Sequence, residues 1–233
     1  MVRAMFAPFP FAGHELALGT CRALYWPAER ALLVADLHLE KASWFAARGQ
    51  MLPPYDSRDT LERLADAVKH TGARRVITLG DNFHDDAGAL RLDAHCTGML
   101  EALTRALDWV WITGNHDADA AAPGGTVAAE LDVRGIALRH MAHRGHDRGE
   151  ISGHFHPKLR IRVRGRQIAR ACGVITENRL ILPAFGALTG GMDAADPAIV
   201  SALQPARSID AIVPAGERLA RFVAEQDGCA ASE

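Results

Sequence analysis

Short apolar runs that end in polar residues recur through the first half of the chain. They cover Ala31–Ala35, Arg75–Leu79 and Trp109–Thr113. Each run has the length and composition of a buried strand. Because polar residues follow all three runs, the pattern predicts a sheet whose strands present polar side chains at their carboxyl ends, where open α/β sheets bind ligands.

Helical periodicity fills the two intervals between these runs. The first interval predicts a helix with Asp56 or Ser57 as its N-cap and Gly72 as its stop. The apolar residues of the two predicted faces are Leu61, Leu64, Ala65 and Val68 in the first helix, and Leu92, Cys96, Met99, Leu100, Leu103 and Leu107 in the second. Alternating strands and helices predict a layered α/β fold.

The second half of the chain has a different pattern, with short β-like runs separated by turn residues. The runs are Ile136–Leu138, Ile151–Ser152, Leu159–Val163 and Arg179–Leu182. They predict a second sheet. We expect a loop at Gln204–Ala215, where prolines interrupt the chain, and a helix at Ala215–Val223. One domain is predicted over residues 1–223, with a frayed tail at 224–233.

Five short segments in or after these runs carry oxygen and imidazole donors. They are Asp36-Leu37-His38, Gly80-Asp81, Gly114-Asn115-His116-Asp117, His140 and Gly153-His154-Phe155-His156. A lone Asp-x-His or Gly-Asp is usually only a turn, but turn chemistry does not explain the His and Asp after Gly-Asn. In Gly-His-x-His, alternate strand residues place two imidazoles on one face.

Together the five segments supply enough donors for two divalent cations. Two ions about 3.5–4 Å apart can activate a water nucleophile and stabilise charge on a phosphoryl group. The ordered set therefore indicates hydrolysis of a phosphate ester. His140 is preferred over the nearby His143 and His146 because it directly follows the strand-like run Gly135–Arg139, and the sequence leaves both alternatives open.

Composition narrows the classes of partner. The chain is 48% hydrophobic and 23% charged, as in ordinary globular proteins. A net charge of −2 argues against a protein that coats nucleic acid by charge alone. The four cysteines show no paired spacing, so neither a disulfide framework nor a cysteine zinc site is predicted. No apolar stretch is long enough to span a membrane, and a cytoplasmic location is expected.

One region is strongly basic, because nine Lys or Arg residues lie within Arg139–Arg170. In a strand, Arg160, Arg162 and Arg164 would share one face and the apolar residues between them would be buried. A solvated sheet face explains this pattern as well as a binding surface does. Proximity to His156 favours contacts to a polyanionic substrate.

The ordered motifs D-x-H, G-D, G-N-H-D, a lone His and G-H-x-H resemble the signature of the calcineurin-like metallophosphoesterase superfamily, over about residues 31–157. Asp36–Lys41, Ile151–Pro157 and Leu182–Ala187 further resemble one branch, the bacterial ligase-associated DNA-damage-response endonucleases. The resemblance implies a four-layer α/β/β/α sandwich of two mixed sheets around a dinuclear centre. It favours manganese, and iron or zinc would suit the same donors.

The resemblance also implies roles for individual residues. The first ion would be held by Asp36, His38, Asp81 and His156, and the second by Asp81, Asn115, His140 and His154, with Asp81 bridging. His116 would protonate the leaving oxygen or stabilise its charge, and Asp117 would orient the His116 ring. His84 departs from the family pattern, since Asp or Gly is common at this position. It could contact the scissile phosphate or support another residue.

Three functions remain open at this point. The favoured one is a DNA endonuclease that prefers single-stranded or flexible DNA, with a link to a DNA ligase and helicase that only the branch resemblance implies. A second is hydrolysis of a small nucleotide or phosphomonoester by the same centre. A third is a binding scaffold without catalysis, which the retention of every motif position disfavours.

Overall fold

A computed structural model describes residues 4–116, 123–145, 148–163 and 166–224, and it contains two seven-stranded sheets. The strands of the first sheet, in spatial order, are β1 (Phe6–Phe11), β2 (His14–Gly19), β3 (Leu24–Trp26), β4 (Ala31–Val34), β5 (Arg75–Leu79), β6 (Asp108–Ile112) and β7 (Thr126–Ala128). Neighbours from β1 to β4 are antiparallel, and those from β4 to β7 are parallel. The three predicted strands are therefore β4, β5 and β6, whose carboxyl ends share one edge.

The second sheet is also mixed. Its strands, in spatial order, are β16 (Arg218–Val223), β15 (Asp210–Ala215), β13 (Gly173–Ile175), β14 (Arg179–Ile181), β10 (Gly149–Ser152), β9 (Ile136–Arg139) and β8 (Glu130–Val133). Strands β9, β10 and β14 are parallel, whereas the other neighbours are antiparallel. The predicted second sheet is confirmed, with the runs at Ile136–Leu138, Ile151–Ser152 and Arg179–Leu182 in it, whereas the run at Leu159–Val163 belongs to a separate two-stranded sheet.

Two predictions at the end of the chain are wrong. The helix predicted at Ala215–Val223 is strand β16, and the loop predicted at Gln204–Ala215 contains strand β15. The two strands pair as an antiparallel hairpin that turns at Gly216, whose φ is +70°. A short apolar pattern fits either a helix or a strand, and here pairing with β13 decides it.

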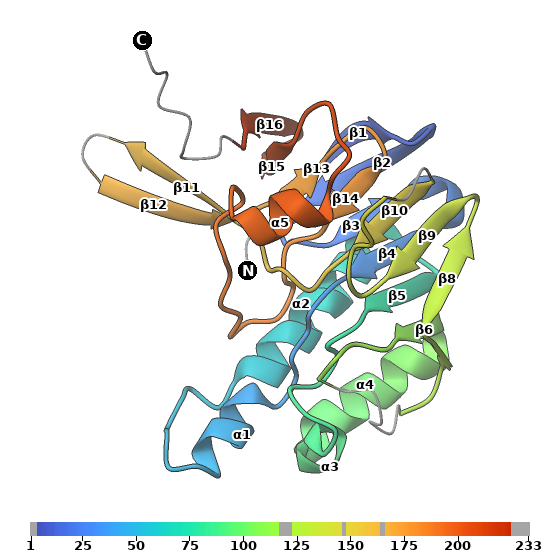
Figure 1. Cartoon of the computed structure of the whole chain (residues 1–233). Coiled ribbons are helices and arrows are strands. Elements are labelled where there is room, and N and C mark those ends of the chain that lie inside the picture. Colours follow the sequence, from blue (N-terminus) through green and yellow to red (C-terminus); the bar gives the residue numbers. More distant parts are fainter. Residues whose placement is uncertain (1–3, 117–122, 146–147, 164–165, 225–233) are drawn as a thin grey trace.

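Helices cover the outer faces of both sheets, which gives four layers (Figure 1). The helical elements are η1 (Pro27–Glu29), α1 (Lys41–Ala46), α2 (Asp56–Thr71), α3 (Gly88–Arg91), α4 (Ala94–Ala106) and α5 (Pro197–Ala202). Helices α2 and α4 lie on the first sheet, and α5 lies on the second. The second predicted helix begins only at α4, where the Asp93 carboxylate caps it by accepting from the Cys96 amide at 2.7 Å.

Three apolar clusters hold the layers together. One lies between the two sheets, one between the first sheet and helices α2 and α4, and one between the second sheet and α5. Successive strand residues point to opposite faces, so that Leu33 enters the cluster between the sheets while Leu32 packs toward the helices. Trp109 and Trp111 pack under the helices. The α/β/β/α sandwich of two mixed sheets is confirmed.

The N-terminus of α2 differs from its prediction. Its N-cap is Tyr55, which makes no capping bond from its side chain. Asp56 accepts instead from the Ala42 amide at 3.0 Å, and the Ser57 hydroxyl donates to the Glu40 carboxylate at 2.7 Å. These buried contacts fix α1 next to the Asp36-x-His38 segment. Gly72 ends α2 in the left-handed conformation, as predicted.

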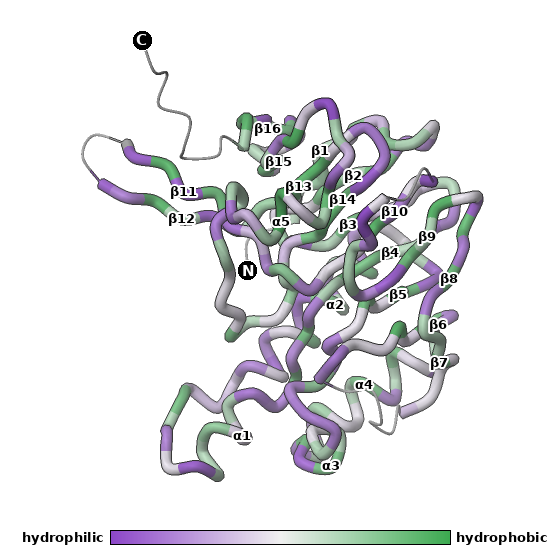
Figure 2. The backbone as a smooth tube through the Cα atoms, in the orientation of Figure 1, coloured by the Kyte–Doolittle hydropathy of each residue, from purple (hydrophilic) through white to green (hydrophobic). Residues whose placement is uncertain are grey.

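A two-stranded hairpin projects from the body of the protein (Figure 1). It is formed by β11 (Lys158–Val163) and β12 (Arg166–Ala171), which confirms the strand predicted at Leu159–Val163. Hydrophobic and hydrophilic residues alternate along β11 (Figure 2). Ile161 is only half-buried, contrary to the prediction of a buried face, because it pairs with Ile168 in this two-stranded unit rather than within a core sheet.

The fold also bears on the predictions about the cysteines and about membrane-spanning segments. Cys21, Cys96 and Cys172 are free thiols, and all three are buried. Within the described part of the chain, no helix combines the length and apolarity that crossing a membrane would need. The predicted tail lies outside the described residues from residue 225 onward.

Candidate metal centre

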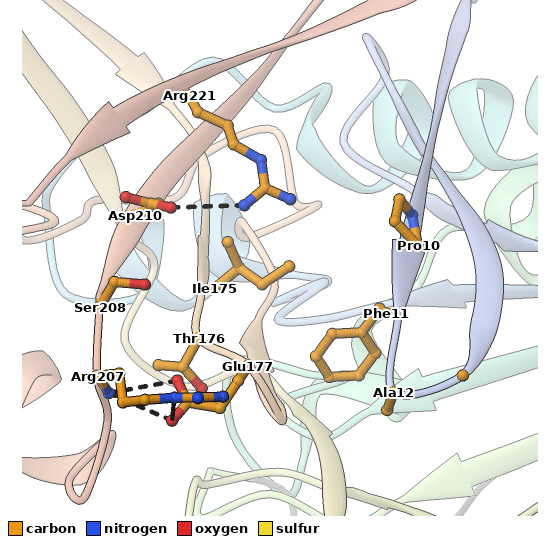
Figure 3. A pocket seen from close by; sticks show the side chains of 11 residues that line it. Pro10, Phe11, Ala12, Ile175, Thr176, Glu177, Arg207, Ser208, Asp210 and Arg221 are labelled. Carbon is orange, nitrogen blue, oxygen red and sulfur yellow. Dashed lines mark hydrogen bonds and ion pairs between the residues drawn. The ribbon is translucent and has the colours of Figure 1, made fainter.

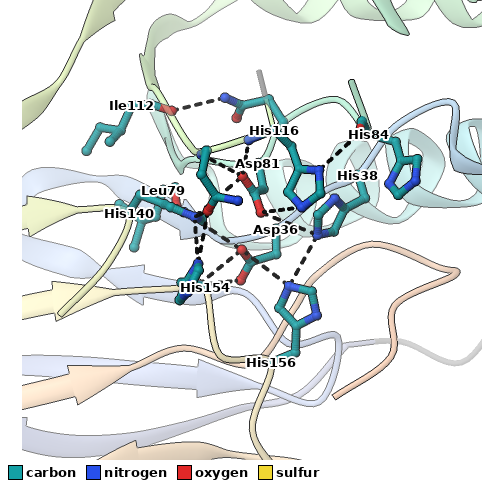
Figure 4. A network of polar contacts seen from close by, with 12 residues as sticks. Asp36, His38, Leu79, Asp81, His84, Ile112, His116, His140, His154 and His156 are labelled. Atoms are coloured by element: carbon teal, nitrogen blue, oxygen red, sulfur yellow. Dashed lines mark hydrogen bonds and ion pairs between the residues drawn. The ribbon is translucent and has the colours of Figure 1, made fainter. Parts of the chain in front are cut away.

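The donor-bearing segments converge where strands of the two sheets end (Figure 4). Their side chains form two groups, in each of which the potential ligand atoms lie within 4.8 Å of one another. The groups are Asp36, His38, Asp81 and His156, and Asp81, His140 and His154. The structure therefore brings together six of the seven predicted ligands in two sets that share Asp81.

In the first group, two imidazoles face two carboxylates. The Nε2 atoms of His38 and His156 lie 3.2 Å apart. Asp81 Oδ2 lies 3.7 Å from His38 Nε2, and Asp36 Oδ1 lies 3.5 Å from His156 Nε2. The imidazole nitrogens and carboxylate oxygens of these four residues thus lie around one small volume.

The second group is tighter and includes Asn115, the seventh predicted ligand. Asn115 Oδ1 lies 2.8 Å from His140 Nε2 and 3.1 Å from His154 Nδ1. The two imidazole nitrogens are 3.1 Å apart, and Asp81 Oδ1 lies 3.4 Å from His140 Nε2. Asp81 therefore presents one oxygen to each group, as a bridging carboxylate would.

The spacing and chemistry of both groups fit divalent cations. Ligands about 2.1 Å from one ion lie about 3.0 Å from each other in octahedral geometry and about 3.4 Å in tetrahedral geometry. The contacts of the second group are close to the shorter spacing, and those of the first group lie around the longer one. Mixed oxygen and imidazole donors suit manganese, iron and zinc.

Surrounding hydrogen bonds orient the candidate ligands. His140 Nδ1 donates to the Leu79 carbonyl at 2.9 Å, which leaves the Nε2 lone pair directed at the second group. Asp81 Oδ1 accepts from the amides of Asn115 and His116 at 3.0 and 3.1 Å. The His154 amide donates to both Asp36 oxygens, at 3.1 and 3.0 Å.

Five candidate ligands have backbone conformations that L-amino acids rarely adopt. Their φ angles are 54° at Asp36, 44° at His38, 49° at Asp81, 73° at His154 and 50° at His156. Such residues cost about 1–3 kcal/mol each and cluster at functional sites. The concentration of strain at these positions indicates that the surrounding structure holds each side chain in place.

Glycines make the close approach possible. A Cβ atom at Gly80 would lie 2.5 Å from His140 Nδ1, and one at Gly114 would lie 2.2 Å from Asp81 Oδ1. At Gly153 it would lie 2.8 Å from Asp36 Oδ2. The glycine of each motif therefore leaves space for a ligand that comes from another segment.

Burial keeps several imidazoles neutral, as metal ligation requires. Loss of water lowers the pKa of His38 to about 2, and repulsion from His156 acts in the same direction. Burial likewise lowers the pKa of His154, with repulsion from His140 as the second cause. Neutral imidazoles offer free lone pairs at neutral pH.

His116 lies at the rim of the centre, where its side chain is 43% exposed. Its Nδ1 lies 3.2 Å from the His84 carbonyl, and its Nε2 lies 3.9 Å from Asp81 Oδ2. This position leaves the ring accessible to a substrate bound at the centre. Asp117, predicted to orient this ring, lies outside the described residues.

His84 lies beside His116 rather than among the metal-facing atoms. The two rings are nearly parallel, with centroids 5.6 Å apart, and Phe45 lies on a similar plane 5.9 Å from His84. Burial lowers the pKa of His84 to about 4, and repulsion from Lys41 adds to this effect. Aromatic packing of His84 favours its supporting role over direct phosphate contact.

The alternative His143 is not a member of either group of ligand atoms. Its Nδ1 accepts a hydrogen bond from Arg139. His146 lies outside the described residues. The geometry therefore favours His140 over His143.

The basic region does not form one continuous patch. Arg139 is buried between Glu150 and Glu130, at 3.4 and 3.1 Å, and Arg148 pairs with an aspartate of β8 at 2.8 Å. Arg160 and Arg162 are exposed on the hairpin. Arg164 lies outside the described residues.

Sequence reasoning missed two arginines that hold a loop against the centre. Arg22 Nη1 donates to the carbonyls of Ala184 and Gly186 at 3.1 and 3.3 Å, and Arg63 donates to the Phe185 carbonyl. The Gly186 amide donates in turn to the Asp36 carbonyl at 3.1 Å. The Leu182–Ala187 stretch stood out in the sequence, but its partners are distant along the chain and no local pattern identifies them.

Comparisons with known proteins give a family and several similar solved structures. The model of the calcineurin-like phosphoesterase family matches residues 29–162. The solved structure of the nuclease MPE from Pseudomonas putida is 29% identical with a TM-score of 0.70, over 93% of this chain and 100% of that chain. YfcE, a phosphoesterase from E. coli, is 14% identical with a TM-score of 0.40, over 84% and 99%. No curated protein matches the chain.

Proposed function

Since the chain belongs to the calcineurin-like phosphoesterase family and is a metal-dependent phosphoesterase, we propose that its substrate is DNA, which it cuts as an endonuclease. One observation carries the chemical part of this proposal. Asp81 belongs to both groups of ligand atoms and presents one carboxylate oxygen to each. Similarity to the P. putida nuclease and the exposed arginines of the hairpin support DNA as the substrate.

We assign the first ion to Asp36, His38, Asp81 and His156, and the second to Asp81, Asn115, His140 and His154. Two divalent cations held there would lower the pKa of a water nucleophile and offset negative charge on the phosphoryl group. Asp81 holds both sites in register, because it reaches each group with a different oxygen.

His116 is proposed as the residue that donates a proton to the leaving oxygen. A DNA leaving group is an alkoxide, which requires a proton as the P–O bond breaks. In its protonated form, His116 would donate from Nδ1 to the His84 carbonyl and carry the transferable proton on Nε2, and the neutral ring left after the transfer would keep the Nδ1 hydrogen bond. Asp117 is proposed to assist this ring.

The hairpin is proposed to contact the DNA backbone. Arg160 and Arg162 occupy one face of β11, which begins two residues after His156. Backbone contacts carry no sequence information and set the position of the strand. Single-stranded or flexible DNA is the preferred form, because a strand must bend to reach a centre whose ligands Asp36 and Asp81 are buried.

The remaining parts of the proposal rest on the branch resemblance. Manganese is proposed as the resident ion, because it suits oxygen and imidazole donors. A role in DNA repair in the cytoplasm, alongside a DNA ligase and a helicase, follows from the same resemblance. These parts are separable from the chemistry, and each can fail without affecting the phosphodiesterase assignment.

A circular single-stranded DNA tests the proposal directly. Such a substrate has no ends, so conversion to a linear product requires an endonuclease. Purified protein with Mn²⁺ should linearise it, and the small diester bis-p-nitrophenyl phosphate should be hydrolysed by the same sample. Rapid hydrolysis of small esters without any cutting of DNA would contradict the nuclease assignment and favour a small nucleotide or phosphomonoester as substrate.

A further inference from the structure

A cavity of about 250 Å³ lies next to the metal centre at the base of the hairpin. Arg22, His156, Lys158, Thr189 and Gly190 are among its lining residues. His156 belongs to the first group of candidate ligands, so the cavity opens beside the reacting atoms. Its wall carries three cations, of which Arg170 is exposed and Arg22 and Lys158 are half-buried. Lys158 has no role in the centre described above, and Arg22 contacts it only through the loop carbonyls of Ala184 and Gly186.

Arg22 is a half-buried cation that forms no ion pair with any described carboxylate. Its Nη1 donates to two backbone carbonyls, which satisfy hydrogen bonds but not its charge. Burial lowers the pKa of Arg22 to about 10, repulsion from Arg63 acts in the same direction, and attraction to the more distant Asp59 carboxylate offsets only part of this shift. A charge removed from water without a counter-ion is unfavourable, and an anion in the cavity would relieve that cost.

Lys158 provides the second charge. Its backbone is fixed, since its amide donates to the Met192 carbonyl and its carbonyl accepts from the Ala194 amide, both at 2.9 Å. Its side-chain methylenes run past Gly191, where a Cβ atom would lie 2.9 Å from Lys158 Cε. In the part of the chain that the structure describes, the Lys158 ammonium has no carboxylate partner.

Another cavity shows what an arrangement with paired charges looks like (Figure 3). It measures about 370 Å³ and lies between the β1–β2 turn and strands β13, β15 and β16. Its two cations are each paired with an acid: Arg207 with Glu177 at 3.5 Å, and Arg221 with Asp210 at 3.4 Å. Unpaired cations therefore distinguish the cavity beside His156.

We propose that this cavity binds a phosphate of the DNA strand next to the one that is cut, with Arg22 and Lys158 as its cationic contacts. This proposal rests on the proposed nuclease function and adds a subsite to it. Guanidinium and ammonium groups are the usual protein partners of phosphate oxygens. A flanking phosphate exists in a polynucleotide and is missing from an isolated diester, so the subsite would favour polymeric substrates.

The experiment pairs a change in the protein with a change in the DNA. A short single-stranded oligonucleotide with one mapped cut is prepared with a neutral methylphosphonate at each phosphate beside the cut, one position at a time. Lys158→Met removes the charge and keeps the methylenes against Gly191. Arg22→Gln is the second variant, and thermal melting checks that it folds. Arg207→Met, in the cavity with paired charges, is the matched control.

For the wild type, one methylphosphonate position should lower kcat/KM by about tenfold, as expected for loss of a charged hydrogen bond. Lys158→Met should lose a similar factor on unmodified DNA and should be insensitive to the methylphosphonate at that position. Its turnover of bis-p-nitrophenyl phosphate should equal that of the wild type. Arg207→Met should behave as the wild type on every substrate.

Three results would overturn the subsite. Wild-type kinetics and full methylphosphonate sensitivity in both cavity variants would remove it, while the nuclease function would stand. An equal loss of small-diester turnover in Lys158→Met would show that this residue acts on the metal centre instead. A wild-type protein that hydrolyses the small diester and never cuts DNA would refute the proposed function, and the subsite with it.

Discussion

The metal centre and the β11–β12 hairpin are neighbours in sequence but are built in opposite ways. His156 ends the last ligand motif, and β11 begins at Lys158. The centre gathers side chains from several segments, most of them buried or half-buried, and five of them have strained backbone. The hairpin is a two-stranded projection whose described arginines are exposed.

This difference separates two demands on the protein. Ligation needs donor atoms fixed to within a few tenths of an ångström, which only a packed surrounding can supply. Contact with a polyanion needs charge at roughly the right place, which a projecting strand provides. Substitutions in the centre should therefore affect every phosphoester, whereas those in the hairpin should affect only polymeric substrates.

The largest effect is expected for Asp81→Ala, because Asp81 is shared by both groups of ligand atoms. We expect a loss of about 10³-fold or more in turnover of both DNA and the small diester, since a metal centre contributes several kcal/mol to such reactions. Metal analysis of the purified variant should show less bound metal. Asp85→Ala, which removes a surface partner of Arg91, is the control. Full metal content and activity in Asp81→Ala would contradict the assignment.

The next effect concerns His116, at the rim of the centre. His116→Ala should reduce DNA cleavage by about 10²-fold or more, the usual contribution of a general acid. The loss on bis-p-nitrophenyl phosphate should be much smaller, because p-nitrophenolate leaves without a proton. Metal content should stay at the wild-type level. An equal loss on both substrates would indicate that His116 supports the centre and does not act as the acid.

The centre was largely predictable from the sequence because its chemistry follows strands that are easy to identify. Buried parallel strands such as β4 and β5 appear as continuous apolar runs. Parallel neighbours end at the same edge, so polar residues just after each run had to meet. The order of the motifs then indicated two ions, and the structure places Asp81 between the two groups.

Features that depend on distant partners were not predictable. Strands β1 to β3 lack a long apolar run, and β15 and β16 become strands by pairing with β13 and each other. Ser57 is a plausible cap in sequence, yet it contacts Glu40. No sequence pattern marks Arg22. Folding places it in the cavity beside His156, where it forms no ion pair with any described carboxylate.

A smaller effect should come from a glycine that contributes no donor atom. Gly80→Ala places a methyl group 2.5 Å from His140 Nδ1, which must shift that ring. Disturbing the orientation of a ligand typically lowers metal affinity about 10–100-fold. Gly72→Ala is the matched control: its φ is also positive, at 64°, but nothing lies within 4 Å of the added methyl.

Both glycine variants should lose about 1 kcal/mol of folding stability or more, because alanine disfavours positive φ. Only Gly80→Ala should require more Mn²⁺ for half-maximal turnover of the small diester. Calorimetry and a metal titration measure the two effects separately. An equal Mn²⁺ requirement in the two variants would mean that His140 tolerates displacement, or that it is not a ligand.

The smallest effect is expected on the hairpin, where Arg162 is the sharper probe of the two described arginines on β11. Arg160 lies 3.6 Å from Asp193 and is partly neutralised, whereas Arg162 has no acidic partner among the described residues. Arg162→Ala should weaken DNA binding a few-fold and reduce the slope of log affinity against log salt by about 0.7, the value for one phosphate contact on a single strand. Turnover of the small diester should not change.

Arg105→Ala on α4, whose partner Glu101 lies one turn away, should leave the slope intact. If Arg162→Ala also leaves the slope unchanged, the arginine face of β11 is a solvated surface. The difference between the rigid centre and the charged hairpin then has no consequence for DNA binding.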